Sequence, residues 1–283
     1  MTTWTPSALQ RARDDYRRGR ARRSLLIAAA STVAVGAGLY LVITSSPGWP
    51  RVQETFFNMR IAWTSLPSVA IGFWLNIRVF TVSAVLMLVF GLLLAVLRTL
   101  RGPVFWPVRA LATCYVELFR AVPLILVLLL VGFGVPGLRL RGVPSSAVVL
   151  GSLALVLTYS AYVAEVFRAG IESVHPSQRA AARSLGLTAG QTMRHVVLPQ
   201  AVRNVIPPLL NDVVSLTKDS GLISILGIPI DAVRSAQIVT AETFNFTPYL
   251  VAGVLFVLLT IPLSRFTDAL SRRHGFIPGG SHL

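Results

Sequence analysis

The sequence predicts an all-α polytopic membrane protein with six transmembrane helices, and three observations lead to this fold class. Only 13% of the 283 residues are charged, which is about half the share found in soluble domains. Hydrophobic residues make up 54% of the chain, and they gather in repeated runs of about twenty, the length of a membrane-spanning helix. Basic residues cluster at the ends of these runs, as the positive-inside rule describes.

The positions of the basic residues also predict the orientation of the chain and exclude one class of partner. The formal net charge is +15, but the arginines that carry it stand at the ends of hydrophobic runs. They do not form the continuous basic stripe that binds nucleic acid, so we expect no nucleic-acid partner. Their asymmetry predicts a multi-pass protein in a cell membrane, surrounded by lipid, with both termini cytoplasmic.

The N-terminal quarter is predicted to hold a basic tail, one span and an interfacial segment. Residues 1–23 are rich in arginine and form a cytoplasmic tail, and residues 24–44 form an extra N-terminal transmembrane helix. A cleaved signal peptide is the alternative for 24–44, but the run has full spanning length and no clear cleavage site follows it. Tryptophans and prolines favour an extracellular interfacial segment at 45–71, with a short amphipathic helix near 53–63.

Residues 72–268 are predicted to hold the other five spans, and residues 269–283 a cytoplasmic tail. Residues 219–247 are too polar to span a membrane and are expected to form an outer loop. Pro207 and Pro208 should kink the span in which they lie, because two backbone donors are lost there. The five spans are expected at residues 72–97, 111–135, 147–167, 200–218 and 248–263.

The loop at 169–199 joins two of these spans and has a distinctive local pattern. Between residues 175 and 199 it contains arginines and histidines but no acidic residue. Pro176 suits the first turn of a helix, and Gly186 suits its left-handed end. Thr188 begins a capping-box spacing that opens a second helix. We therefore expect two short helices with a glycine corner between them.

The first of these short helices is predicted to carry a docking surface for another protein. One of its faces has small and apolar residues, and another has two arginines four positions apart. An ordinary positive loop that only sets the orientation is the alternative. The residues expected on the two faces are Gln178, Ala181, Ala182 and Leu185 on one, and Arg179 and Arg183 on the other.

This loop resembles the permease signature of ATP-binding-cassette importers. The resemblance rests on Ala181-Ala182, Gly186, Val196 and Leu198-Pro199 at the spacing of that motif. In the family, the motif opens Glu-Ala-Ala and forms the coupling helix that docks on the ATPase subunit. Here Ala180 stands at the glutamate position, which leaves the loop more basic than is usual. The resemblance implies that residues 178–186 couple this chain to an ATPase.

Three further segments resemble the subfamily that imports polar amino acids of the glutamate, glutamine and histidine type. They are residues 115–123, 160–168 and 216–222, which read YVELFRAVP, SAYVAEVFR and LTKDSGL. The matches extend over about residues 70 to 273. They imply the five-helix core of a type I importer permease, with the span at 24–44 added to it, in the plasma membrane of a bacterium.

Polar residues within the spans are candidates for a substrate pathway or gate, because charged groups in spans are costly. Two acid–arginine pairs at three-residue spacing can also simply neutralise themselves. The polar residues near Pro208 can bind a zwitterionic amino acid at a helix break, or only mark the water interface. The candidates are Glu117, Arg120, Glu165, Asn211, Asp212, Lys218 and Asp219.

The resemblance implies a permease subunit that moves a polar amino acid, with glutamate as one candidate, into the cytoplasm by alternating access. We find no phosphate-binding loop, catalytic constellation or metal-ligand cluster in the sequence. ATP and magnesium are therefore expected on a partner ATPase dimer. The other implied partners are a second permease subunit, identical or related, and an extracellular substrate-binding protein. The alternatives are a secondary transporter driven by an ion gradient and a structural membrane subunit.

Overall fold

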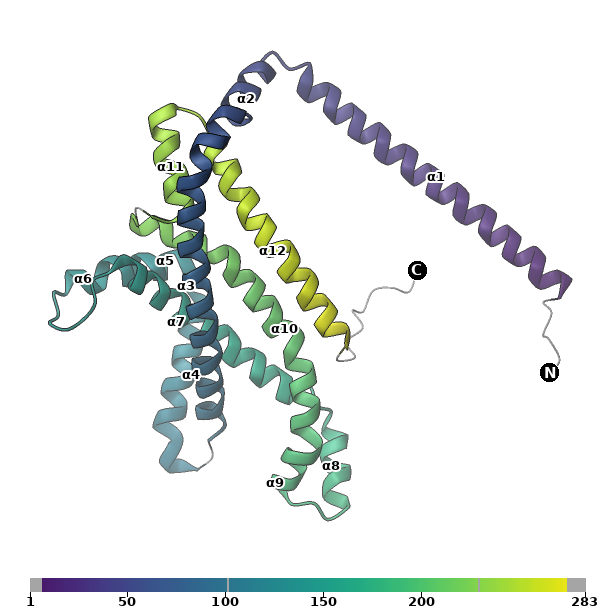
Figure 1. Cartoon of the computed structure of the whole chain (residues 1–283). Helices are drawn as coiled ribbons and strands as arrows, with labels where there is room; N and C mark the ends of the chain where they lie inside the picture. The colour runs from purple at the N-terminus through teal and green to yellow at the C-terminus, as the bar shows by residue number, and fades with distance from the viewer. Residues whose placement is uncertain (1–6, 101, 229, 274–283) are drawn as a thin grey trace. The chain divides into compact units, whose positions relative to one another are not determined.

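The computed structural model describes residues 7–100, 102–228 and 230–273, and every regular element in these ranges is helical (Figure 1). The predicted all-α class is thereby confirmed. The chain divides into two units, one up to Phe57 and the other from Asn58. Their relative placement is not determined, so each is described by itself. Residues 1–6 and 274–283 of the two predicted tails lie outside the described residues.

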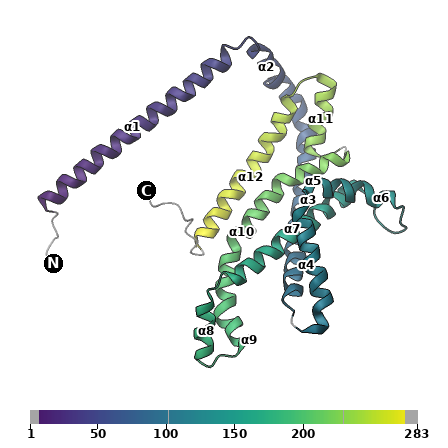
Figure 2. The same ribbon diagram turned by 180° about the vertical axis from the view of Figure 1, so that it is seen from behind.

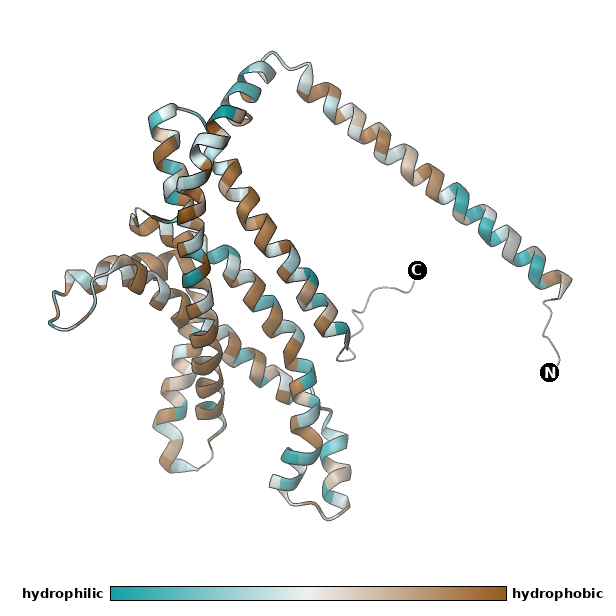
Figure 3. Cartoon of the chain, viewed as in Figure 1, coloured by the Kyte–Doolittle hydropathy of each residue, from teal (hydrophilic) through white to brown (hydrophobic). Residues whose placement is uncertain are grey.

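Unit 1 contains α1 (Ala8–Thr44) and α2 (Trp49–Phe56). The predicted basic tail is not separate from the predicted span, because α1 runs without interruption from the arginine-rich part into the apolar part (Figure 3). Ser7 caps this helix by accepting a hydrogen bond from the Gln10 N–H at 3.3 Å. The helix predicted near 53–63 is instead α2, which starts earlier, with Pro50 in its first turn.

The first helix of unit 2, α3, begins thirteen residues before the predicted start at residue 72. It extends over Met59–Thr99 and includes Pro67. Asn58 fixes the start, because its Oδ1 accepts a hydrogen bond from the Ile61 N–H at 3.2 Å. The predicted interfacial segment 45–71 is therefore divided between α2 and the first turns of α3.

The predicted span at 111–135 is not one straight helix. A 3-10 turn (Pro103–Phe105) leads into α4 (Trp106–Ala121), and the chain continues as α5 (Leu124–Leu129), a π-helical turn (Leu130–Gly134) and α6 (Val135–Gly137). The second half is bent by 109° from the direction of the first half. Pro123 explains the break, because it has no N–H and forces the preceding Val122 into an extended conformation, ψ 128°.

The remaining helices place the predicted loop at one end of unit 2. Helices α8 and α9 project beyond the neighbouring helices in both views (Figures 1 and 2). A π-helical turn, Met193–Val197, joins α9 to α10 without a loop. Helix α10 continues through Pro207 and Pro208, so the two prolines do not end it. The helices are α7 (Ala147–Glu172), α8 (Pro176–Ser184), α9 (Ala189–Thr192), α10 (Leu198–Asp219), α11 (Ala232–Thr243) and α12 (Thr247–Arg273).

The segment predicted as an outer loop, 219–247, is mostly helical in its described residues and partly buried in unit 2. It consists of a 3-10 helix (Ser220–Leu226), a turn and α11, which packs against α3 and α12. The buried side chain of Asn76 on α3 bonds to the first residue of the 3-10 helix and to the first residue of α11. Its amide donates to the Ser220 carbonyl at 2.9 Å, and its Oδ1 accepts from the Ala232 N–H at 3.0 Å. The polar composition of this segment predicts a loop and does not indicate that it packs against other helices.

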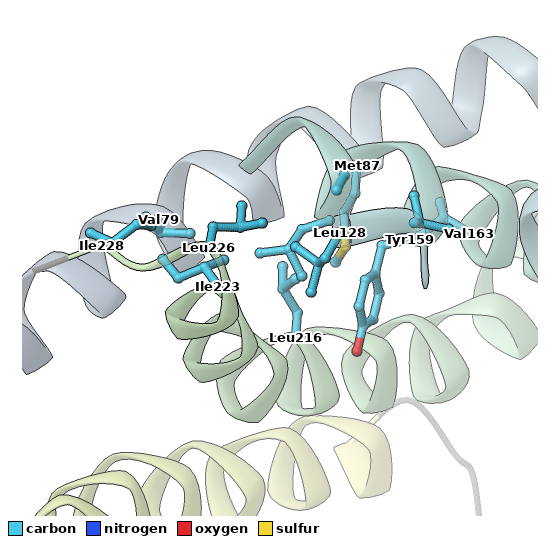
Figure 4. Packing of buried hydrophobic residues seen from close by; sticks show 12 residues of the cluster. Val79, Met87, Leu128, Tyr159, Val163, Leu216, Ile223, Leu226 and Ile228 are labelled. Carbon is cyan, nitrogen blue, oxygen red and sulfur yellow. The ribbon is translucent and has the colours of Figure 1, made fainter. Parts of the chain in front are cut away.

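The main apolar core lies where α3, α5, α7 and α10 meet the 3-10 helix (Figure 4). Helices α3 and α7 approach closely at Gly91, where a Cβ atom would overlap the side chain of Val163. Met87, Leu128 and Leu216 are fully buried in this cluster. Helices α3 and α7 are therefore closely packed, and the other helices of the core pack around this pair.

Within the described residues, four helices are long and apolar enough to cross a membrane, or five when the bent pair 103–121 and 124–137 counts as one span. These four are α1, the helical stretch that ends with α3, α7 and α12. Helix α10 has 22 residues, enough for roughly 33 Å, but its polar residues keep it below the hydropathy of a span. The chain is thus a membrane protein, and the predicted number of six spans is not confirmed.

Candidate functional site

The glycine corner after α8 has the geometry that the sequence predicts. Gly186 has φ +86°, in the left-handed region. The N–H of Leu187 donates to the Ala182 carbonyl at 3.2 Å, and the N–H of Gly186 donates to the Arg183 carbonyl at 3.0 Å. This pair of bonds is a Schellman motif, which ends a helix and sets the exit direction of the chain.

The second short helix also starts as predicted, with a complete capping box. Thr188 Oγ1 accepts from the Gln191 N–H at 3.3 Å, and Gln191 Oε1 accepts from the Thr188 N–H at 2.9 Å. Both interactions tie the side chains to the backbone of the first turn of α9. Together with the corner at Gly186, they fix the angle between α8 and α9 by local bonds alone.

The two arginines of α8 have different environments, which the sequence did not reveal. Arg179 is half-buried, and its guanidinium donates to the carbonyl of Ile171 in the last turn of α7. A cation at this position also opposes the negative end of the α7 dipole. Arg183 is exposed on the outer side of α8. Arg179 therefore holds α8 against α7, and only Arg183 presents its charge to the surroundings.

The residues of the predicted small-residue face of α8 also differ in their exposure. Ala182 is 5% exposed and faces inward, whereas Leu185 is 84% exposed. Gln178, Ala180 and Ala181 are also exposed. Ala182 therefore lies away from the exposed face of α8, and its role in ATPase coupling stays a prediction. The exposed surface of α8, called the α8 surface below, consists of Gln178, Ala180, Ala181, Arg183 and Leu185.

Tight packing connects this loop to the helices on either side of it. A Cβ atom at Gly170 in α7 would overlap the side chain of Val205 in α10. Asn204 Nδ2 donates to Ser173 Oγ at 2.8 Å just below this contact. The last turn of α7 and the first turns of α10 thus lie in direct contact where α8 begins.

The carboxylate of Glu165 joins three helices near the same end of unit 2. It pairs with Arg98 of α3 at 3.1 Å, with Arg120 of α4 at 3.5 Å and with Arg168 of its own helix, α7. The predicted pair of Glu165 with Arg168 is present. The predicted pair of Glu117 with Arg120 is not, because Arg120 turns to Glu165 and the exposed Glu117 makes no ion pair within the described residues.

Asp212 and Asp219 gather around a tyrosine that the sequence analysis did not select. Tyr159 Oη donates to Asp219 Oδ2 at 2.7 Å, across the contact between α7 and α10. Asp212 lies seven residues, or about two helical turns, before Asp219, so both carboxyl groups are on the same side of α10. Figure 4 shows the Tyr159 ring at the edge of the apolar core, with its hydroxyl toward α10.

The other two polar candidates on α10 lie apart from this group. Asn211 is exposed and lines a cavity of about 280 Å³ between α10 and α12, together with Asp268 and Arg272. Lys218 is exposed near the end of α10. The seven candidates therefore separate into an ion cluster around Glu165, a polar group at Tyr159, and the single positions Glu117, Asn211 and Lys218.

Arg98 and Tyr159 were missed for different reasons. Arg98 stands at the end of a span and was counted only as a positive residue of a loop. Tyr159 lies in an apolar run, where a tyrosine usually packs, and only the neighbouring helix reveals the partner of its hydroxyl. Among the described residues, no group of three histidine, cysteine or acidic side chains is placed to hold a metal ion.

Residues 87–275 match the family of binding-protein-dependent transport system inner membrane components. This match covers most of unit 2, including the loop, the Glu165 cluster and the polar group at Tyr159. The chain belongs to this family.

Individual relatives of the family agree with this assignment over nearly their whole length. The chain is 36% identical to the probable glutamine ABC transporter permease protein GlnM of Bacillus subtilis over 219 residues, which are 76% of this chain and 97% of GlnM. It is also 36% identical to the glutamate transport system permease protein GluC of Corynebacterium glutamicum over 226 residues, 76% of this chain and 98% of GluC. About a quarter of this chain therefore has no counterpart in either relative.

A solved structure shares the fold. A chain of an amino acid ABC transporter, crystallised with histidines, matches with a TM-score of 0.67 and 32% identity, over 73% of this chain and 94% of its own length. The methionine transporter MetNI, at 21% identity and a TM-score of 0.56, shows the fold alone. The family therefore explains the arrangement of unit 2.

Proposed function

We propose that this chain is the membrane-spanning subunit of an ATP-driven importer for a polar amino acid. Two such subunits, identical or related, form the pathway; two ATPase subunits bind at the α8 surface, and a separate binding protein delivers the substrate from outside. Relatives named for glutamine, glutamate and arginine support the amino-acid class. We assign the extra helix α1 to an added N-terminal span. We assign both termini to the cytoplasm.

The observation that carries this proposal is the fixed geometry of the α8–α9 loop. Its corner is held by a Schellman motif, its second helix by a capping box, and α8 is held to α7 by Arg179. A loop that served only to orient the chain would need positive charge but no such bonds. A preformed helix with exposed apolar and basic side chains suits the groove of a partner protein.

Transport by the reconstituted complex tests this function. Proteoliposomes that contain this chain and the ATPase, supplied with the binding protein, should take up one of glutamine, glutamate, arginine or histidine only with ATP inside. Uptake should persist when an ionophore removes ion gradients. Uptake that needs a gradient and no ATPase would support the secondary-transporter alternative instead.

A pair of arginine variants tests the docking step separately. Arg183→Glu reverses an exposed charge of the α8 surface, so it should weaken co-purification of the ATPase, and more strongly at low salt, where charges are less screened. Arg179→Gln removes the bond to Ile171 and should lower the thermal stability of the isolated permease. If Arg183→Glu leaves ATPase binding unchanged at every salt concentration, the proposed docking surface is wrong.

Reporter fusions test the proposed orientation. A reporter at Gly142, between α6 and α7, should be found outside, and a reporter at Gly190, in α9, should be found inside. The opposite result would place α8 on the wrong side of the membrane for an ATPase. It would remove the docking argument while leaving the family assignment intact.

A further inference from the structure

A cavity of about 560 Å³ lies where α3 and α7 end and α4 begins, beside the Glu165 cluster and without Tyr159 in its lining. It has the size of a small-molecule site. Its walls come from the last turns of α3 and α7 and from the first three turns of α4. The charged residues that line it are Arg98, Arg109, Glu117, Arg168 and Glu172.

Two of these charges are available to a ligand, and they have opposite signs. Arg98, Arg168 and Glu172 are engaged in the ion pairs around Glu165. Glu117 makes no ion pair or hydrogen bond within the described residues. Arg109 donates one bond, from Nη1 to the Leu100 carbonyl at 3.2 Å, and its other donors have no partner there. The cavity thus presents one carboxylate and one guanidinium.

The same two groups lie at different depths along α4. Glu117 is eight residues beyond Arg109, so it lies about 12 Å further along the helix axis. Side chains on a helix lean toward its N-terminus, so the Glu117 side chain leans toward the turn that carries Arg109. A ligand with an anionic group and an ammonium group can pair with both side chains, whereas a simple anion can pair with Arg109 alone.

The entrance of the cavity has the character of a membrane interface. Trp106 lines the cavity and is 61% exposed, and Phe105 beside it is 44% exposed. Aromatic side chains at helix ends gather at the level of lipid headgroups. Basic pockets between spans at this level bind headgroup phosphates. The neighbouring surface of α4 is apolar and includes the exposed Leu111, which suits contact with acyl chains.

We propose that this cavity binds the headgroup of a phosphatidylethanolamine lipid, with its phosphate at Arg109 and its ammonium at Glu117. The ethanolamine ammonium carries N–H donors that the carboxylate can accept. A choline headgroup lacks these donors, and a glycerol headgroup lacks the cation. A free amino acid from the aqueous side offers the same two charges and is the competing source.

The single cysteine of the chain provides a probe inside the cavity. Cys114 is exposed and lines the cavity between Arg109 and Glu117. Its rate of alkylation by N-ethylmaleimide is to be measured on the full chain in nanodiscs of pure phosphatidylcholine. The measurement is repeated with a fraction of phosphatidylethanolamine or of phosphatidylglycerol, and native mass spectrometry counts the lipid that stays bound.

The expected result is slower alkylation, by several-fold, with phosphatidylethanolamine only, together with selective retention of that lipid. Glu117→Gln should abolish both effects, and Glu117→Asp should keep part of them. Glu242→Gln, an exposed acid on α11, is the matched control and should behave like the unchanged chain. A melting temperature equal to that of the unchanged chain verifies that each variant is folded.

Three results would overturn the proposal. The first is equal alkylation in the three membranes. The second is a phosphatidylethanolamine effect that survives in Glu117→Gln, because the carboxylate would then have no part in binding. The third is protection of Cys114 by free glutamine in pure phosphatidylcholine without a specific effect of phosphatidylethanolamine, which would assign the cavity to a soluble amino acid.

Discussion

Arg98 and Glu165 are joined by a hydrogen bond of 3.1 Å between Nη1 and Oε2, although 67 positions separate them in the chain. Both side chains are largely shielded, with 16% and 18% of their surfaces exposed. The bond fastens the end of α3 to α7, and Arg120 of α4 reaches the same carboxylate. The Glu165 carboxylate thus pairs with one arginine from each of three helices, α3, α4 and α7.

Glu165→Gln should therefore destabilise the protein. The change leaves the guanidinium groups of Arg98, Arg120 and Arg168 facing one another without a carboxylate, at a cost on the order of 1 to 3 kcal/mol because the site is partly shielded. Glu172→Gln is the matched control, since Glu172 is 61% exposed and pairs only with Arg168. It should cost only a few tenths of a kcal/mol, as exposed pairs do. Thermal melts in detergent compare the two, and equal losses would contradict the central role of Glu165.

Gly186→Val should separate transport from folding. A Cβ atom at Gly186 would have no atom within 4 Å, but φ +86° strains any branched residue by roughly 1 to 3 kcal/mol. The corner should change its angle and turn α9 away from its direction. Gly190→Val is the control, because Gly190 is equally open and lies outside the left-handed region. Substrate-stimulated ATP hydrolysis in proteoliposomes should fall only in Gly186→Val. Full stimulation in both variants would show that the corner has no part in coupling.

Tyr159→Phe should lower uptake by about tenfold, the effect of losing roughly 1.4 kcal/mol from one hydrogen bond to a charged group. The variant removes the donor that orients Asp219 and keeps the ring that packs on the core. Tyr162→Phe is the control, because Tyr162 meets Tyr159 edge to face at 5.8 Å without a hydrogen bond of its own in the described residues. Uptake and ATPase co-purification are measured together. A loss of assembly, or an equal effect of both changes, would assign Tyr159 to packing.

Asp231 should make the folding stability depend on pH. It lies outside the spans, before α11, and burial raises the pKa of its carboxyl to about 6, against the hydrogen bonds from Val233 and Arg234 that lower it. The folded state therefore holds the proton more tightly than the unfolded state. Stability should fall as pH rises from about 4 to about 6, by on the order of 2 kcal/mol from this group.

Asp231→Asn tests this dependence without removing the helix cap, because an amide oxygen can accept the same two backbone hydrogen bonds. Its melting temperature should change less between pH 4 and pH 6 than that of the unchanged chain. An identical pH profile in the two proteins would mean that other acids cause the dependence.

Local features of the loop could be predicted from the sequence, and long-range contacts could not. Pro176, Gly186 and Thr188 act within a few residues of themselves, so the helix start, the left-handed corner and the capping box all appear as expected. The pair of Glu165 with Arg168 is local in the same way. Arg98 and Arg120 reach Glu165 only because α3, α4 and α7 pack together, which no short spacing reveals.

The errors in the fold have equally physical causes. Pro123 lies in a long apolar run, where hydropathy favoured one span over residues 111–135 and outweighed the bend that the proline introduces. The segment 219–247 is polar, yet it packs against α3. The side chain of Asn76 on α3 bonds to two backbone groups of the segment, the Ser220 carbonyl and the Ala232 N–H. The hydropathy of a segment depends only on its own residues, so it does not reveal hydrogen-bond partners on other helices.

The missing side chain at Gly170 has a mechanical consequence. Because the backbone of α7 rests directly on Val205 of α10, no soft layer lies between the two helices where the loop leaves them. We therefore expect a displacement of α8 to move α7 and α10 together. Any bulkier residue at position 170 should push the two helices apart at this point, and it would change this coupled movement without altering the α8 surface.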